Sequence, residues 1–522
     1  GLMREEEARH EAMELKAAPA GGLGSGARAL GFLWSYRGFL GEVSRSRRAL
    51  RRFPEILAIR RQMLRVAALS AGEAGPADAG GPEGEPQDPA AQAALARLGD
   101  MIASLFLELG GVWPKVAQIV SLRPDVVRWG PVRLALARSH DACLPKPDEE
   151  VQAIFSASAP GLDGVLRLGE RLGAGSIAQV HALEPRPGAR PPAGGELVAK
   201  VAFHGEHWKM AEDFRIMEQL GSNTGRDEVS QLFRSIWLFI QNSIEQIEGE
   251  FDLAREAAFT REGAELVARG QDEVRGHVAS AFALRAPEVP ELAVAEVAEG
   301  SSGAVLLLRR VRGTPLLEFV DGLAGAERAR AERALFGAIF TWLGWMILSQ
   351  GFFHGDPHPG QFLVEPGARR LWLLDWGLCQ HLSSAQLRDV RELYQLLSLQ
   401  YDEGALSPRL LQAGPALVGY LCGSLAMERT VAWAVAAVDA EHRRRVAAVM
   451  RRMGFAVRSG SDLSLTAAAF GFFDTNAAFN SVEVLNRWQS IDSLVSIPGS
   501  YLVLMRIVTT LGGYARRLRE RP

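Results

Sequence analysis

The spacing of hydrophobic residues changes several times along the chain, and each change predicts a different kind of element. Apolar residues recur at helical spacing from Ala90 to Val120 and again from Val132 to Arg138. Between Leu166 and Phe203 they form short runs separated by turn residues, a pattern typical of β-strands. Helical spacing returns from His207 to about Arg269. The first half of the chain is therefore predicted to be helical on either side of a strand-rich region.

The second half begins with strands and ends with helices. Strands and turns alternate from Ala286 to Val311, with a buried strand expected at Ala304–Leu308. The apolar run Leu371–Leu374 lies between turn-rich segments and predicts another buried strand, whereas the sequence after Asp375 is almost entirely helical in pattern. This order predicts an α+β fold with two lobes, one small and strand-rich and the other largely helical.

These patterns divide the chain into four expected parts. Residues 1–89 form an N-terminal extension, 90–165 a helical segment, 166–311 a strand-rich lobe with inserted helices, and 312–522 a mostly helical lobe. Within the extension, aromatic and aliphatic residues precede many arginines between Leu30 and Leu69. That stretch fits either an amphipathic segment on an anionic membrane surface or a helix packed on the protein.

The apolar run Ala334–Phe353 is the best candidate for a membrane span, but it contains Trp, Thr, Gln and Gly. We therefore expect a buried core helix there rather than a transmembrane one. The chain begins with Gly rather than Met. We accordingly expect a mature or truncated form, from which any targeting peptide would be missing.

Composition argues against several classes of protein. The 522 residues are 48% hydrophobic and 23% charged, an ordinary globular balance with room for more than one domain. The net charge of −3 argues against binding of nucleic acid by the whole chain. Three widely separated cysteines, Cys143, Cys379 and Cys422, argue against a disulfide scaffold and fit a reducing compartment.

Two carboxylates within residues 352–378 are the first candidates for chemistry. Asp356 follows a His-Gly pair on a predicted loop, and Asp375 follows the apolar run and precedes Trp-Gly. The residues between them have the layout of a hairpin. Protein kinases place a catalytic base and a metal ligand in this way, with the signatures HRDxxxxN and DFG, and Gln361 stands where the Asn would be. The alternative is a surface turn beside an ordinary strand-end Asp.

A glycine-containing loop and a lysine precede these acids in the order found in kinases. Small residues in such a loop allow backbone N–H groups to approach phosphate oxygens closely. Lys200 lies in the following predicted strand, where a kinase lysine reaches the α- and β-phosphates. Taken singly, the loop could be an ordinary turn between strands, and Lys200 could be an ordinary residue of an edge strand. The order of the loop, Lys200 and the two acids along the chain is that of kinases and favours a nucleotide site. The loop residues are Gly173, Ala174, Gly175 and Ser176.

The lysine requires a carboxylate partner. The predicted helical stretch 247–258 supplies Glu250, Asp252 and Glu256. Because Glu250 and Glu256 are six residues apart, they lie on different parts of a helix surface and could serve two different lysines. A solvated acidic helix face is the alternative.

Together these motifs resemble those of the UbiB/ADCK atypical kinase-like family, also called aarF-domain-containing kinases. HGDPHPGQF is similar to the family pattern HxDPHPGN, LLDWG to its DFG variant, and EFDLAREA to ExDxxxEA. GAGSIAQVH stands in place of the family's Ala-rich loop, and ELGGVWPKVAQIVSLRPDVV resembles the KxGQ segment. The resemblance covers roughly Ala90 to Arg517, most of the chain.

The resemblance implies a protein-kinase-like fold whose N-terminal helical segment lies over the active site, and it implies binding of ATP and Mg²⁺. Lys115 and Gln118 would be residues of this lid, and Glu250 would pair with Lys115. Lys200 would bind the nucleotide phosphates and pair with Glu256.

The same resemblance assigns roles to the acids and widens the functional expectation. Asp356 would be the catalytic-loop acid, and Asp375 would hold Mg²⁺, with Gln361 in place of the family's Asn ligand. Because a lid occupies space that a protein substrate needs, ATPase activity or phosphorylation of a small molecule is favoured. The family implies a membrane lipid or prenyl-quinone precursor (coenzyme Q type) as partner and a biosynthetic protein complex. It also implies peripheral association with a mitochondrial, plastid or bacterial inner membrane.

Departures from the family pattern leave alternatives open. Gln361 offers its amide oxygen one methylene further out than Asn, and Mg²⁺ demands near-ideal geometry. Ala117 replaces the Gly of KxGQ, the nucleotide loop has two glycines, and Arg309–Arg310 stand where a hinge acid would be expected. A catalytically weak pseudokinase that acts as a nucleotide-gated membrane scaffold is therefore an alternative. A conventional protein kinase is less favoured, because no APE-like segment follows Asp375–Gly377 closely.

Overall fold

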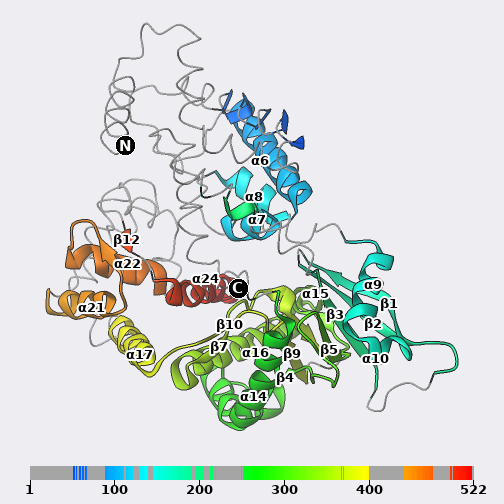
Figure 1. Cartoon of the computed structure of the whole chain (residues 1–522). Coiled ribbons are helices and arrows are strands. Elements are labelled where there is room, and N and C mark those ends of the chain that lie inside the picture. Colours follow the sequence, from blue (N-terminus) through cyan, green and yellow to red (C-terminus); the bar gives the residue numbers. More distant parts are fainter. Residues whose placement is uncertain are drawn as a thin grey trace, which may run out of the picture.

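The computed structural model has a lobe built around a sheet and a larger, mostly helical lobe, with three further helices beside them (Figure 1). The predicted α+β class with two lobes is confirmed, whereas the exact domain boundaries stay predictions. The structure describes isolated residues between 51 and 66, and then 89–121 without 111 and 112, 129–138, 145–203 without 176 and 190–194, 212–215, 218, 249, 251–398 without 366 and 368, 440–473, 494–496 and 498–519.

Four antiparallel strands form the sheet of the smaller lobe, in the order β1-β2-β3-β5. They correspond to the short apolar runs in the sequence, and the loop that contains the glycines joins the first two of them, as predicted. Their bounds are Leu166–Ala174 for β1, Ala178–Pro185 for β2, Leu197–Ala202 for β3 and Val305–Arg309 for β5.

Two helices that the apolar pattern did not predict cover one face of this sheet, α9 (Asp148–Ser158) and α10 (Pro160–Asp163). Three acidic residues in the first turn of α9 favour a helix start there. Val151 and Phe155 of α9 are completely buried in a cluster that includes Val201 of β3. The helix therefore completes the core of the smaller lobe on that face.

The opposite face of the sheet meets helix α14 (Leu253–Ala281). Side chains alternate between the two faces of a strand, so Lys200 and Ala202 lie on the face opposite to Val201. Ala202 packs in a small apolar cluster with residues of the first turns of α14. The alternation therefore brings Lys200 to the helix that carries Glu256.

A second four-stranded sheet, in the order β4-β9-β8-β6, supports the acids of the larger lobe. β8 and β9 form the antiparallel hairpin predicted between Asp356 and Asp375, and β9 ends just before Asp375. A separate antiparallel pair, β7 and β10, brackets the same region. The bounds are Ala286–Glu288 for the 3₁₀ turn η2, Glu291–Val294 for β4, Thr314–Pro315 for β6, Phe352–His354 for β7, Pro359–Gln361 for the 3₁₀ turn η4, Phe362–Val364 for β8, Arg370–Leu373 for β9 and Cys379–His381 for β10.

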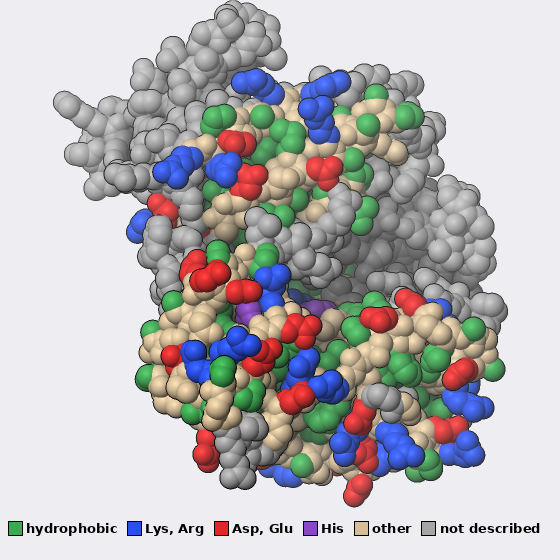
Figure 2. Space-filling view, turned by 90° about the vertical axis from the view of Figure 1, so that its right-hand side faces the viewer, with side chains coloured by type: hydrophobic (Ala, Val, Ile, Leu, Met, Phe, Trp, Pro, Cys, Tyr) green, Lys and Arg blue, Asp and Glu red, His purple; other side chains and the backbone are tan. Residues whose placement is uncertain are grey.

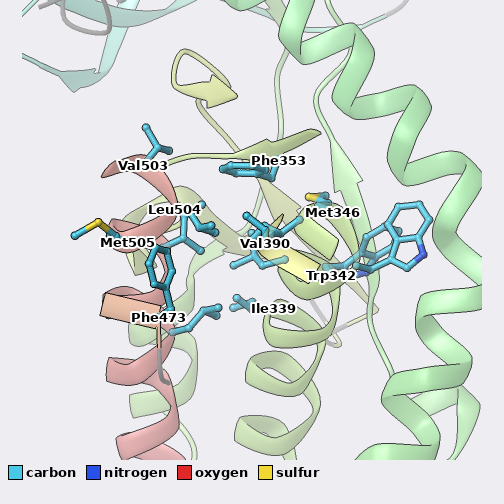
Figure 3. Close-up of a cluster of buried hydrophobic side chains, with 14 of the residues drawn as sticks. Ile339, Trp342, Met346, Phe353, Val390, Phe473, Val503, Leu504 and Met505 are labelled. Atoms are coloured by element: carbon cyan, nitrogen blue, oxygen red, sulfur yellow. The ribbon is translucent and has the colours of Figure 1, made fainter. Parts of the chain in front are cut away.

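Helices form most of the larger lobe and bury an extensive apolar core. Figure 3 shows Ile339 and Trp342 of α16 meeting Phe353 of β7 and Leu504 of α24 in this core. The C-terminal helix is therefore an integral part of the lobe. The bounds are Leu316–Asp321 for α15, Gly325–Trp345 for α16, Met346–Gln350 for the π-helical turn η3, Ser384–Ser398 for α17, Ala440–Arg452 for α21, Asp462–Phe473 for α22 and Gly499–Arg519 for α24.

Three helices precede the smaller lobe, α6 (Pro89–Leu109), α7 (Trp113–Ser121) and α8 (Gly130–Arg138). The helical pattern predicted from residue 90 to 120 is interrupted at Gly110, whose φ of +62° lies in the left-handed region. Such a glycine commonly ends a helix. The single predicted helical run is therefore two helices.

Two helices among the described residues are long and apolar enough to cross a membrane, α6 and the continuous helix Gly325–Gln350. In the second, 67% of the apolar window is buried inside the protein. That burial supports the prediction of a core helix around Ala334–Phe353. Figure 2 shows acidic and basic side chains interspersed over the described residues of one face of the molecule.

The structure corrects two expectations about element bounds. α14 continues to Ala281, whereas the apolar pattern ended it near Arg269. Short strands interrupt the helical region after Asp375, namely β10, β11 (Ala456–Val457) and β12 (Leu494–Ser496). Of the possible amphipathic segment at 30–69, residues 30–50 and 67–69 lie outside the described residues. In the described part, Gln62 donates to Ala94 O of α6 at 2.8 Å and Val66 is buried, so this part packs on the protein.

We predict that Gly263 of α14 is required for packing of this helix on the larger lobe. A Cβ at Gly263 would lie 2.6 Å from Cε3 and Cη2 of the buried Trp376 ring, so Gly263→Ala should lower the free energy of unfolding by about 1–3 kcal/mol. Gly276 lies on the same helix, and a Cβ there would meet no described atom within 4 Å. Gly276→Ala should instead stabilise the protein by about 0.5–1 kcal/mol. Urea unfolding measures both changes, and equal stability of the two variants would contradict the packing.

Candidate nucleotide site

Lys200 Nζ lies between two carboxylates that come from different elements. It donates to Oε1 and Oε2 of Glu256, at 2.9 Å and 2.8 Å, and to Oδ1 of Asp375 at 3.0 Å. Lys200 comes from β3, Glu256 from the first turn of α14, and Asp375 from the turn after β9. The contact between Lys200 and Glu256 that the family resemblance implied is therefore present, and Asp375 joins it.

Local structure explains how Glu256 is accommodated as a charge. Asp252 is the N-cap of α14, and its carboxylate accepts hydrogen bonds from the backbone N–H groups of Ala254 and Arg255. Glu256 then lies in the first turn, where the helix dipole favours a negative charge. Its side chain is only 4% exposed. A charge buried to this extent requires a partner, and Lys200 supplies one.

The assignment of the neighbouring acids is corrected in part. The helix begins at Leu253, so Asp252 lies outside it and caps it, rather than projecting from a helical face as the sequence analysis assumed. Glu250 lies outside the described residues. Lys115 and Gln118 lie on α7, but their side chains are not described. The pairing expected between Lys115 and Glu250 therefore stays a prediction.

Asp375 adopts an unusual backbone conformation, with a φ of +50°. For a residue other than glycine, a left-handed conformation is uncommon and persists where the surrounding contacts over-determine it. Its Oδ1 accepts hydrogen bonds from Gly377 N at 3.3 Å and from Lys200. The side chain is 42% exposed. The carboxylate is thus held firmly and is still accessible to an ion.

The charges on Lys200 and Asp375 stabilise each other. Burial lowers the pKa of Lys200, but the carboxylates of Asp375 and Glu256 more than offset this and raise it above its ordinary value. Burial raises the pKa of Asp375, yet the ammonium of Lys200 outweighs it and holds this pKa well below the ordinary range. Both groups therefore carry their charges across the physiological pH range.

His354 connects the loop of one acid to the turn of the other. Its Nδ1 accepts a hydrogen bond from Asp356 N at 3.1 Å, so the proton of the neutral ring lies on Nε2. Nε2 then donates to the backbone oxygens of Leu374 and Asp375, at 3.1 Å and 2.9 Å. The ring is completely buried, and burial lowers its pKa. His354 therefore acts as a neutral connector, a role that the sequence analysis did not assign to it.

Asp356 lies on the loop after β7 and is held from the C-terminal helix. Its Oδ1 forms an ion pair with Nη2 of Arg506 at 2.7 Å, and the two side chains are 17% and 23% exposed. Tyr514 Oη, from the same helix, donates to Pro357 O at 2.7 Å. Sequence reasoning missed Arg506, because nothing in the local pattern connects residue 506 to residue 356.

The glycine loop joins β1 to β2, as predicted. Gly173 and Ala174 end β1, and Gly175 N donates to Ala178 O at 2.8 Å across the turn. Among the described residues, a Cβ at Gly173 would meet nothing within 4 Å, and one at Gly175 would meet only Ala178 O at 3.5 Å. Packing against the described residues therefore does not require either glycine. Ser176 lies outside the described residues.

Gln361 ends the turn η4, and its backbone oxygen accepts from Leu374 N at 2.8 Å. This bond places residue 361 beside the end of the strand that leads to Asp375. The side-chain amide lies 3.1 Å from Nε2 of His358. Within the described part of the chain, no group of three His, Cys, Asp or Glu side chains could hold a metal ion by itself. Mg²⁺ commonly takes one or two protein ligands plus substrate phosphates, and Asp375 with Gln361 fits that donor set.

Trp376 stands where the kinase signature has Phe, and it anchors the turn that carries Asp375. Its Nε1 donates to Leu373 O at 3.1 Å, and its ring packs edge-on against His354 with centroids 5.2 Å apart. A Cβ at Gly377 would lie 3.1 Å from both Asp375 Oδ1 and Glu256 Oε2. A small residue after Trp376 therefore lets the two carboxylates lie close to Lys200.

Arg309, the last residue of β5, and Arg310, the next residue, form ion pairs with acids of the strand lobe. Arg310 forms ion pairs with Glu170 at 3.5 Å and Glu196 at 3.8 Å, and Arg309 lies 3.9 Å from Glu296. These two residues therefore have a role in surface ion pairing at the place where a hinge acid was expected.

We predict that Lys200 and Glu256 are energetically coupled. Lys200→Met leaves the buried Glu256 carboxylate without this ammonium, and it should lower the free energy of unfolding by about 3 kcal/mol. The double variant Lys200→Met/Glu256→Gln removes both charges. Its loss of stability, measured by urea unfolding at neutral pH, should be clearly smaller than the sum of the two single losses. If the loss in the double variant equals the sum of the single losses, the contact between Lys200 and Glu256 contributes nothing to the free energy of unfolding.

Comparison with known proteins shows which family the sequence matches. Residues 140–405, about half of the chain, match the ABC1 atypical kinase-like domain. A "Probable protein kinase UbiB" from Marinobacter nauticus is 25% identical over 328 residues, covering 57% of this chain and 53% of the relative. The "AarF domain-containing protein kinase 1" of Xenopus tropicalis is 29% identical over 276 residues, covering 51% of this chain and 46% of the relative.

A plant relative is similar to the same extent. The chloroplastic "Protein ACTIVITY OF BC1 COMPLEX KINASE 3" of Arabidopsis thaliana is 25% identical over 313 residues, covering 57% of this chain and 38% of the relative. The matches thus span about half or less of the length of these three relatives. The motifs around Lys200, Asp356 and Asp375 and the match to the family model lead to one conclusion. The chain belongs to the ABC1 atypical kinase-like family, which includes proteins named UbiB and AarF domain-containing kinases.

Proposed function

We propose that the protein is an ATP- and Mg²⁺-dependent ATPase, or a small-molecule or lipid kinase, that supports prenyl-quinone or membrane-lipid metabolism. The observation that carries the proposal is Lys200 held between Glu256 and Asp375 at hydrogen-bonding distance. A lysine fixed by a helix carboxylate beside a metal-binding acid is the arrangement that kinases use to position nucleotide phosphates.

Each residue of the site has a role that its geometry supports. Lys200 would hold the α- and β-phosphates. Their approach to the loop is supported by Gly173, where a Cβ would meet no described atom within 4 Å. Asp375, whose carboxylate is ionised and partly exposed, would hold Mg²⁺ with Gln361. When bound, Mg²⁺ neutralises the charge that develops on the phosphate oxygens. Asp356 would accept the proton of the attacking hydroxyl or water.

The proposed substrate and cellular location are supported by the family resemblance and the relatives, not by the geometry of the site. Relatives occur in a bacterium under the name UbiB and in a chloroplast. We therefore propose peripheral association with a bacterial inner membrane or an organelle membrane, within a biosynthetic complex. A membrane lipid or prenyl-quinone precursor would be the phosphate acceptor or effector. The helices α6–α8, with Lys115 and Gln118 on α7, would form a lid that disfavours protein substrates.

We predict that nucleotide binding requires the metal and that turnover requires Asp375. The melting temperature of the purified chain should rise with Mg²⁺-ATP and rise much less with ATP plus chelator, because Asp375 binds the nucleotide through the ion. Asp375→Asn should lower the rate of ATP hydrolysis at least about 100-fold, since metal ions supply several kcal/mol to phosphoryl transfer. Rates are compared with and without lipid vesicles. Hydrolysis by the wild type at the level of the Asp375→Asn control in both conditions would overturn the proposal.

A second candidate function is favoured by the contact of the Gln361 amide with His358. If this contact diverts the amide from the metal, the protein is a pseudokinase that binds nucleotide and acts as a membrane scaffold with little turnover. The two functions share the binding site and differ in the rate that the site supports.

We predict that Gln361→Asn separates these two functions. Under the scaffold hypothesis, wild-type turnover is low, and Gln361→Asn should raise it by about tenfold, as expected for a gain of about 1.4 kcal/mol in the transition state. Under the enzyme hypothesis, the wild type already turns over and the substitution has little effect. The rate of phosphate release at saturating Mg²⁺-ATP is the measurement, with thermal shift by Mg²⁺-ATP as a check that both proteins bind nucleotide.

A further inference from the structure

The C-terminal helix α24 contacts the loop that carries Asp356 at three successive places. Arg506 Nη2 lies 2.7 Å from Asp356 Oδ1, and Tyr514 Oη donates to Pro357 O at 2.7 Å. Val503 lies against Gly355, where a Cβ would come within 2.7 Å of Val503 Cγ1. The close approach of α24 therefore requires glycine at position 355, where the kinase signature HRD has arginine.

α24 packs into the core of the larger lobe on both sides of Arg506. Residues of this helix on either side of Arg506 belong to the main core of the larger lobe, as Figure 3 shows for Val503, Leu504 and Met505. Further along the helix, the Tyr514 ring stacks on Phe336 of α16 with centroids 5.3 Å apart. The guanidinium is thus presented to the loop from a fixed support.

The loop itself contains no lysine or arginine that could take the place of Arg506. The residues from Asp356 to Gln361 are Asp-Pro-His-Pro-Gly-Gln, and the two prolines also lack N–H donors. An arginine is suited to fix a carboxylate, because its planar donors define the direction of the acid as well as its charge. Both partners are mostly buried, with exposed fractions of 17% and 23%. The pair is therefore more than a solvated surface contact.

We propose that Arg506 is a positioning residue for the reaction at Asp356. By binding Oδ1, it orients the carboxylate so that its other oxygen receives the proton of the attacking water or hydroxyl. In that step the attacking oxygen forms a bond to the γ-phosphorus, its proton passes to Asp356, and the bond from the γ-phosphorus to the bridging oxygen breaks to release ADP. This inference rests on the proposed function, because it assigns Arg506 to the same reaction.

The test compares Arg506→Met, Arg506→Lys and Tyr514→Phe in the full chain. Arg506→Met keeps the apolar stem and removes the charge, and it should lower kcat by about 100-fold, the cost of misplacing a catalytic group by about 1 Å. The KM for ATP should change by no more than about twofold. The thermal shift produced by Mg²⁺-ADP should be the same as in the wild type. Arg506→Lys should recover part of kcat. Tyr514→Phe removes a bond between the same helix and loop without changing charge, and it should leave kcat nearly unchanged.

The outcomes separate positioning from other roles. Equal losses of kcat in Tyr514→Phe and Arg506→Met, or a loss of Mg²⁺-ADP binding, would show that α24 merely supports the fold. Faster turnover in Arg506→Met would show that the ion pair restrains the acid, and would overturn the proposal.

A measurement that does not depend on turnover distinguishes this inference from the proposed function. In denaturant unfolding, Asp356→Asn/Arg506→Met should lose less stability than the sum of the single losses. Additive losses would overturn the inference whatever the activity. If the losses of the variants are coupled but the wild type does not hydrolyse ATP, the contact between Asp356 and Arg506 is supported. The proposed function is then overturned, and the positioning role with it.

Discussion

The rest of the site depends on one ammonium group held between two carboxylates. Lys200 brings a strand, a helix and the turn after the hairpin to a common point, because it bonds to Glu256 and Asp375 at once. The Glu256 side chain is only 4% exposed, and a buried carboxylate without a partner is costly, so its contact with Lys200 stabilises the folded protein. Asp375, in turn, keeps its charge in a left-handed turn because Lys200 offsets its burial. Removal of Lys200 would leave both carboxylates without this ammonium.

Helix α14 connects the contact with Lys200 in the smaller lobe to the packing of the larger lobe. Its first turn presents Glu256 to the sheet, and further along its length two glycines accommodate Trp376 and Trp345. Since Trp376 adjoins Asp375, the helix that contacts the lysine through Glu256 also packs on the residue next to Asp375. The separation of these two groups is thus set by packing within the interior and not only by their mutual attraction.

Local signals in the sequence were enough to predict the parts of the site that are close in the chain. The hairpin and the strand-end position of Asp375 follow from short apolar runs, and Lys200 follows from its place after a glycine loop. The length of α14 was underestimated because Gly270 resembles a helix end, whereas its lack of a side chain serves Trp345. Arg506 was missed because a contact between distant segments leaves no periodic trace in either one.

His354 links the loop that carries Asp356 to the turn that carries Asp375. Arg506 of α24 contacts Asp356 and Lys200 of β3 contacts Asp375, so the two acids are held by segments that lie after and before them in the sequence. The imidazole between them accepts from Asp356 N and donates to the carbonyls before and at Asp375. A second proton on the ring would occupy Nδ1 and break the bond to Asp356 N. Burial lowers the pKa of His354 and disfavours that second proton, so the spacing of the acids is kept as pH falls toward the ordinary pKa of histidine.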